Sequence, residues 1–195
     1  MAQHPVALPG GAFTPDDAAR LGISARSLQR LASTGRVERI AHGLYQRPET
    51  ATYDTELYAA ASRHPLATLC LTSALAHHGL TDTIPAQTDL ALPRGTHRPT
   101  AGSTIRWHVF DADTFTIGRD TTTVEGTDAS VGLYSAERSI VDAFRLRNEV
   151  GYEIGVEALR AWLRRRGSTP AALLSIANAL PRAQRPLREA LSYLA

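Results

Sequence analysis

Hydrophobic positions in the N-terminal quarter of the chain follow the spacing of short helices. A first helix is predicted from Thr14, an N-cap residue that precedes a proline and two aspartates. We expect Ala18, Ala19 and Leu21 to form its small apolar face. Gly22 should end the helix, because glycine accepts a positive φ.

A second helix is predicted from Ser24, which caps it, to about Ser33. Leu28, Leu31 and Ala32 recur at spacings of three and four residues, so they should share its buried face. The positions left facing outward are polar: Arg26, Ser27, Gln29, Arg30 and Ser33.

Two short strands are predicted next, between Val37 and Tyr45, with a turn near residues 41–43. Gly35 separates them from the second helix. Helix, glycine-containing turn, second helix and β-ribbon is the layout of a winged helix-turn-helix, whose second helix enters the major groove of DNA.

The outward side chains of the second helix suit this role. Arginine pairs bidentately with guanine, glutamine pairs with adenine, and serine bonds to bases or phosphates. The ribbon would place further polar groups where phosphates pass. The predicted DNA-binding set is Ser24, Arg26, Ser27, Gln29, Arg30, Ser33, Arg36, Arg39, His42 and Arg47. The alternative is a helical hairpin whose polar face is merely solvated.

The pattern after the ribbon predicts a larger domain, reached through a hinge at residues 47–50. Helices are expected at residues 54–62 and 66–78, the second being the central buried helix. Strands are expected at 88–92, 104–110, 114–117, 121–124 and 131–134, then a helix capped at Ser135 and C-terminal helices at 152–166, 170–180 and 186–194. The fold class is therefore α+β, with an N-terminal winged helix-turn-helix (residues 1–49) and a larger mixed α/β domain (residues 50–195) whose C-terminal part is helical.

Composition removes several classes of enzyme. All 21 basic residues are arginine, so a P-loop lysine, a Schiff-base lysine and the lysine of a restriction-type nuclease are absent. A single cysteine, Cys70, fits a reducing cytoplasm, and its apolar neighbours indicate a packed, inert thiol. We find no apolar run of membrane-spanning length and no secretory signal, so we expect a cytoplasmic protein without a membrane partner.

The net charge of +2 conceals an uneven distribution. Residues 1–50 carry six arginines and four acids, residues 51–137 five and ten, and residues 138–195 ten and five. A second basic surface is possible at Arg145, Arg147, Arg160, Arg164, Arg165 and Arg166. It could extend the DNA footprint or meet an acidic protein, or it could simply be a solvated face or pair with the acidic middle.

No group of residues makes a convincing active site, and we predict no catalytic residue, metal or cofactor. Asp89, Asp111 and Asp113 with Glu125 or Glu137 could be arranged as a two-metal site, but the accompanying lysine is missing. His77 and His78 are adjacent on a helix and point about 100° apart, which disfavours a shared ion. Ser73 and His77 lack an acid placed to orient the histidine.

The run from Leu21-Gly22 through Leu28, Leu31, Gly35, Arg39 and Gly43-Leu44-Tyr45 to Pro48 resembles the N-terminal domain of AbiEi-type antitoxins of type IV (AbiE-like) toxin–antitoxin systems. DLALPRGTHRP at 89–99 and GLYSAERSIVDAFRLR at 132–147 are similar to that family too. One departure is that members often carry a fuller apolar helix before the equivalent of Thr14. Either that helix is missing, or another part of the chain covers the exposed face.

The resemblance implies a regulator that binds its operon promoter through the winged helix and represses it. It also implies that the C-terminal domain counteracts an AbiEii-like nucleotidyltransferase toxin, with or without a direct complex. Two other functions stay open: an enzymatic antitoxin that covalently modifies the toxin, for example by phosphorylation, and a winged-helix transcription factor that senses a small ligand.

Overall fold

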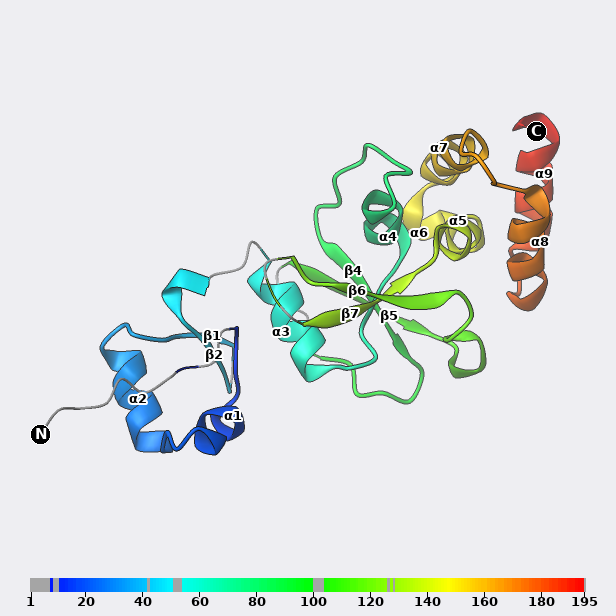
Figure 1. Ribbon diagram of the computed structural model, residues 1–195. Coiled ribbons are helices and arrows are strands. Elements are labelled where there is room, and N and C mark those ends of the chain that lie inside the picture. The colour runs from blue at the N-terminus through cyan, green and yellow to red at the C-terminus, as the bar shows by residue number, and fades with distance from the viewer. Residues whose placement is uncertain are drawn as a thin grey trace, which may run out of the picture. The chain divides into compact units, whose positions relative to one another are not determined.

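The computed structural model describes residues 8, 11–41, 43–50, 54–99, 104–125, 127 and 129–194 (Figure 1). The fold is α+β, as predicted. Contacts divide the chain into two compact units, Met1–His64 with Thr123–Ser130, and Pro65–Thr122 with Val131–Ala195. The first unit is longer than the predicted winged helix because it includes α3 (Thr55–Arg63), which contacts β1 (Glu38–Ala41). The assignment of separate roles to residues 1–49 and 50–195 stays a prediction.

The first unit has the predicted order of elements. It contains α1 (Pro15–Arg20), α2 (Ala25–Ser33), β1, β2 (Leu44–Gln46), the 3-10 helix η1 (Pro48–Thr50) and α3. β1 and β2 are antiparallel, with Arg39 opposite Tyr45. This arrangement is compatible with a winged helix-turn-helix.

Phe13 provides the apolar cover that the sequence left unassigned in front of α1. It is 2% exposed and joins Ala18, Ile23, Leu28 and Val37 in one hydrophobic cluster. Its backbone N–H donates to the Tyr45 carbonyl at 2.7 Å, and the Tyr45 N–H donates back at 2.9 Å. Phe13 therefore pairs with β2 through backbone hydrogen bonds, in addition to the pairing of β2 with β1.

The predicted apolar face of α1 is wrong in part. Ala18 is buried, but Ala19 is exposed and Leu21 is 51% exposed. The reason is that Leu21 lies in the turn after α1, where the buried apolar side chain is Ile23, at 3% exposure.

The second unit is built on a mixed sheet. Among the described residues it has five strands in the order β5-β4-β3-β7-β6, in which β4 is parallel to β5 and antiparallel to β3, and β3 is parallel to β7. The strands are β3 (Thr68–Leu69), β4 (Thr88–Pro93), β5 (Ile105–Phe110), β6 (Arg119–Thr123) and β7 (Ser130–Tyr134). Gly132 lies opposite Thr68, whose Oγ1 would be 2.4 Å from an added Cβ, so the close strand approach requires glycine.

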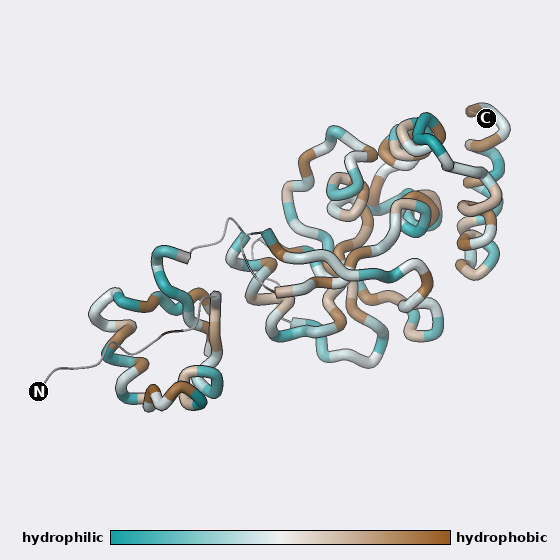
Figure 2. Tube along the Cα trace, viewed as in Figure 1, coloured by the Kyte–Doolittle hydropathy of each residue, from teal (hydrophilic) through white to brown (hydrophobic). Residues whose placement is uncertain are grey.

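The helices of this unit gather around α5 (Ala136–Arg145), which contacts α4, α7, α8 and α9. The other helices are α4 (Leu71–His77), α6 (Arg147–Val150), α7 (Tyr152–Leu163), α8 (Pro170–Ala179) and α9 (Gln184–Leu194). Figure 1 shows α8 and α9 beyond α5. Figure 2 shows hydrophilic and hydrophobic residues alternating along α9, whose Leu187, Ala190 and Leu191 are buried.

Three predictions for this region are corrected. The helix at 66–78 is instead β3 followed by α4, because an unbroken apolar run does not distinguish a buried strand from a helix. The central helix is accordingly α5. The C-terminal helix at 152–166 ends at Leu163, which leaves Arg164, Arg165 and Arg166 beyond the regular helix.

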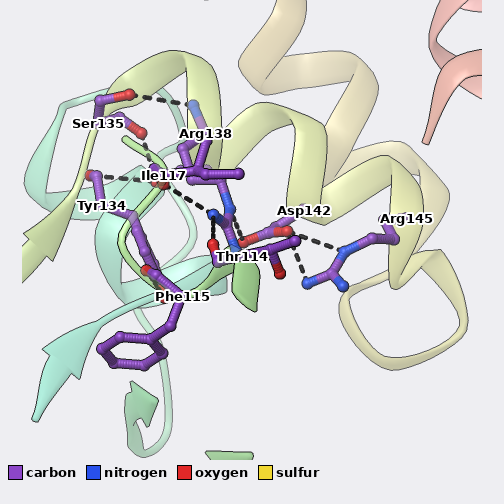
Figure 3. A network of polar contacts seen from close by, with 9 residues as sticks. Thr114, Phe115, Ile117, Tyr134, Ser135, Arg138, Asp142 and Arg145 are labelled. Carbon is purple, nitrogen blue, oxygen red and sulfur yellow. Dashed lines mark hydrogen bonds and ion pairs between the residues drawn. The ribbon is translucent and has the colours of Figure 1, made fainter. Parts of the chain in front are cut away.

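The third correction concerns residues 114–117, which are not a strand: Thr114 ends η2 (Ala112–Thr114), and residues 115–117 form turns. The Thr114 and Ile117 carbonyls accept hydrogen bonds from Arg138 Nη1 at 2.9 and 2.7 Å (Figure 3). The Thr114 carbonyl also accepts the Ile117 N–H at 3.3 Å, a hydrogen bond within a turn, so this segment satisfies its backbone groups as a turn held by Arg138 and not as a strand.

Arg138 itself is fully buried. Its Nε donates to Asp142 Oδ2 at 2.8 Å, and its guanidinium lies 4.4 Å from the centroid of the Tyr134 ring. The Tyr134 hydroxyl donates to the Phe115 carbonyl, and burial raises the pKa of Tyr134 far enough to keep it protonated. Arg138 and Tyr134 thus hold the same turn from two sides.

We expect Phe13→Ala to lower the stability of the first unit by about 3–5 kcal/mol, because it removes the largest side chain of a small core. Amide hydrogen exchange should show faster exchange at Leu28 and Tyr45 and none of this acceleration at Leu90. The control is Leu21→Ala, an apolar truncation at an exposed site. Equal protection in Phe13→Ala and wild type would contradict the assigned role.

We expect Asp142→Asn to destabilise the second unit by about 3–5 kcal/mol, because it leaves the buried Arg138 cation uncompensated. Tryptophan fluorescence during urea unfolding reports on this unit, since Trp107 and Trp162 both belong to it. Glu189→Gln breaks only the exposed pair with Arg185 and should behave as wild type. A small loss in Asp142→Asn would show that the pair is dispensable.

Candidate nucleic-acid interface

Local capping fixes the two helices of the first unit. Thr14 and Asp17 form a capping box at α1, and hydrogen bonds from the Thr14 side chain and backbone lower the pKa of Asp17. Gly22, with φ of 78°, turns the chain between the helices. The Ser24 Oγ then accepts the Ser27 N–H at 3.2 Å and caps α2.

The outer side of α2 carries the side chains that the sequence placed there. Arg26, Gln29, Arg30 and Ser33 are exposed, and Ser27 is half-buried. The opposite side packs inward through Leu28, which is 3% exposed, with Leu31 and Ala32 against the same core. The structure therefore brings the predicted helix residues together on one accessible face, while their contact with DNA stays a prediction.

The serine hydroxyls on this face are already used locally. Ser24 Oγ donates to Ser27 Oγ at 3.0 Å, and Ser33 Oγ donates to the Arg30 carbonyl at 2.9 Å. The hydroxyl protons of Ser24 and Ser33 are thus used at the two ends of the helix. Direct reading of base edges would fall mainly to Arg26, Gln29 and Arg30.

The basic side chains differ in how far they are engaged. In the part of the chain that the structure describes, the guanidinium groups of Arg26, Arg30 and Arg36 make no hydrogen bond or ion pair, and all three residues are exposed. By contrast, Arg20 is paired with Asp17 at 2.9 Å. Exposed cations without an acidic partner are available to phosphates and guanines.

The predicted residues of the ribbon have different surroundings. Arg39 is exposed, and Arg47 is half-buried with Nη2 donating to the Leu8 carbonyl at 3.0 Å, which ties the chain in front of α1 to β2. Gln46 is buried and donates to Glu38. His42 lies outside the described residues.

The second basic set of six arginines has several different surroundings. Arg145 belongs to the Asp142 network, with its Nε 3.0 Å from Oδ1, and Arg147 donates to the Phe144 carbonyl. Arg165 donates to the carbonyls of His78 and Gly79 after α4, which satisfies that helix end. Arg160 and Arg164 line a shallow hollow beside α7, and Arg166 is exposed.

Residues weighed for other chemistry have structural partners. Asp89 accepts from His108 Nε2 at 2.9 Å, Ser73 Oγ accepts the Asp89 N–H, and Asp111 caps η2. His78 bonds to the Tyr134 carbonyl through its ring.

Burial raises the pKa of the Cys70 thiol, which is fully enclosed, and lowers the pKa of His77. Within the described ranges, no three potential metal ligands lie together. No helix in that part of the chain is long and apolar enough to cross a bilayer.

Comparison with known proteins finds a family match within the first unit. Residues 9–48 match a family described as "Transcriptional regulator, AbiEi antitoxin", and no curated protein matches the chain. The matched residues span α1, α2, β1 and β2 and include the exposed Arg26, Arg30 and Arg36. The N-terminal part of this chain, residues 9–48, is therefore a domain of the AbiEi antitoxin family of transcriptional regulators.

Proposed function

We propose that the protein is a cytoplasmic regulator that binds promoter DNA through α2 and the β1–β2 ribbon. The observation that carries this proposal is the cluster of unpaired, exposed Arg26, Arg30 and Arg36 on the domain that matches the regulator family. α2 buries its apolar side and presents Arg and Gln outward, as a recognition helix requires. Phosphates would be met by Arg36 and Arg39.

We further propose that the protein is the antitoxin of a type IV pair and represses its own operon. Residues 50–195 would then be the part that counteracts an AbiEii-like nucleotidyltransferase toxin. This finer assignment is supported by the family match at the N-terminus and by the similarity of residues 89–99 and 132–147 to the same family. Co-expression with the product of the adjacent gene tests it: rescue of growth supports the antitoxin role, and undiminished toxicity rejects it.

Arg26→Ala and Arg30→Ala should relax the sequence preference for the operator. Loss of one bidentate base contact typically costs about 1–3 kcal/mol at the base pair it reads. Mobility shifts with the upstream region and with single-base variants would measure the change. Arg188→Ala, which removes an exposed arginine of α9, is the charge-matched control. Unchanged preference in both α2 variants, with folded protein, would reject α2 as the reading helix.

Arg36→Gln should instead weaken binding to all DNA sequences about equally. If Arg36 contacts one phosphate, the dependence of log K on log salt should flatten by about one unit. Titrations at several salt concentrations, with operator and with unrelated duplex, would show this. A loss confined to the operator would mean that Arg36 reads bases.

A further inference from the structure

A cleft of about 460 Å³ opens in the second unit where two parallel strands end. Arg94 follows β4 and Asp111 follows β5, and both residues line the cleft. β4 and β5 run parallel with Pro93 beside Phe110, so their carboxyl ends lie at the same edge. In open α/β sheets, ligands bind in the crevice outside the carboxyl ends of strands. The volume is within the range of small-molecule sites.

Arginine dominates the lining of this cleft. Arg94 and Arg98 come from the connection after β4, Arg145 from the end of α5, and Arg182 from the turn between α8 and α9. Within the described residues the guanidinium groups of Arg94, Arg98 and Arg182 make no hydrogen bond or ion pair. Two acids, Asp111 and Glu149, line the same cleft, so the lining keeps a surplus of positive charge. The excess of guanidinium groups over carboxylates in this lining favours an anionic occupant.

Arg145 is held rigidly at this site. Its Nε and Nη2 lie 3.0 and 2.8 Å from Asp142 Oδ1, and its guanidinium lies 5.1 Å from the centroid of the Phe110 ring. Its side chain is 12% exposed, and its buried Nη2, although it lies close to Asp142, makes no hydrogen bond among the described groups. A cation fixed in this way loses little conformational freedom when it binds a ligand.

Arg182 adds backbone strain at the rim of the cleft. Its φ is 68°, in the left-handed region that non-glycine residues rarely adopt. Strained residues of this kind cluster at ligand sites, because the surrounding structure must hold them in place. Its guanidinium is a further unpaired cation in the described lining of the cleft.

We propose that this cleft binds a small phosphate ester that carries hydroxyl groups, such as a nucleotide or a sugar phosphate. Guanidinium groups recognise phosphate bidentately, and four of them line the cleft. The Asp111 and Glu149 carboxylates can accept hydrogen bonds from ligand hydroxyls, which bare orthophosphate lacks. The site belongs wholly to the second unit, so it goes beyond the DNA-binding role of α2.

Isothermal titration calorimetry of the full chain with AMP, ribose 5-phosphate and orthophosphate tests the proposal. We expect saturable 1:1 binding of at least one ester, tighter than that of orthophosphate. Binding of AMP alone would assign a nucleotide, and binding of both esters a general sugar phosphate. Absence of binding by both esters, or binding of a glutamate-rich peptide in their place, would overturn the proposal.

Variants distinguish ligand binding in the cleft from a nonspecific effect of the protein's positive charge. Arg94→Gln combined with Arg98→Gln should weaken the ester by about tenfold or more, whereas Arg188→Gln should not. Arg182→Gly should weaken the ester while leaving the thermal midpoint equal or higher, because glycine relieves the positive φ. Equal losses in Arg188→Gln, or full binding in both cleft variants, would overturn the assignment.

A recognition-helix variant distinguishes this proposal from the proposed regulator function. Arg26→Ala with Arg30→Ala should bind the ester as wild type does, even though operator binding is impaired. If the ester is lost in this variant, its site is not the cleft and the inference fails. If the operator is never bound but the ester is, the regulator function fails and the ligand site stands.

Discussion

The second unit depends on how one carboxylate is shared between two arginines. Asp142 Oδ2 accepts from Arg138, which has no exposure, and Oδ1 accepts from Arg145 at the edge of the cleft (Figure 3). A buried ion pair is weak evidence for stability by itself, because desolvation can exceed the Coulombic gain. Its effect here is to define geometry: Arg138 orients the Thr114 and Ile117 carbonyls, and so determines where the chain turns between β5 and β6.

The first unit has only a small hydrophobic cluster to hold its elements together. Its cluster contains one large aromatic, Phe13, together with Ile23, Leu28 and smaller side chains. Because that cluster is small, the backbone bridge from Phe13 to Tyr45 and the caps at Thr14 and Ser24 define the positions of α1 and α2. Rigid placement of α2 would serve the proposed DNA binding, since a base contact requires correct positioning of the guanidinium.

Sequence patterns predicted the elements whose signals are local. The caps at Thr14, Ser24 and Ser135, the glycine turns and the strand at Ile105–Phe110 all depend on neighbours a few residues away, and these elements are confirmed. The expected alternation of buried and exposed residues along that strand fails at its end, where Val109 is 44% exposed and Phe110 is buried. The incorrect predictions concern segments whose secondary structure is determined by contacts with residues distant in the sequence. Residues 66–78 are apolar at most positions, and only pairing with β4 and β7 makes Thr68–Leu69 a strand. The turn at 114–117 is set by Arg138, more than twenty residues away. The exposed face of α2 could be predicted, whereas the convergence of Arg94, Arg145 and Arg182 could not, because it is created by tertiary packing alone.

The same carboxylate connects the core with the cleft. Asp142 cannot follow a displaced Arg145 without weakening its bond to Arg138, and Arg138 in turn holds the turn after β5. Arg94 and Arg98, from the connection after β4, line the same cleft as Arg145, which comes from the end of α5. An anion at the cleft would compete with Asp142 for Arg145 and would therefore act on a residue that the fold requires. The Asp142 carboxylate would therefore couple the cleft to the core. A phosphate ester bound at Arg145 could change the stability of the second unit in this way without any rearrangement of its strands.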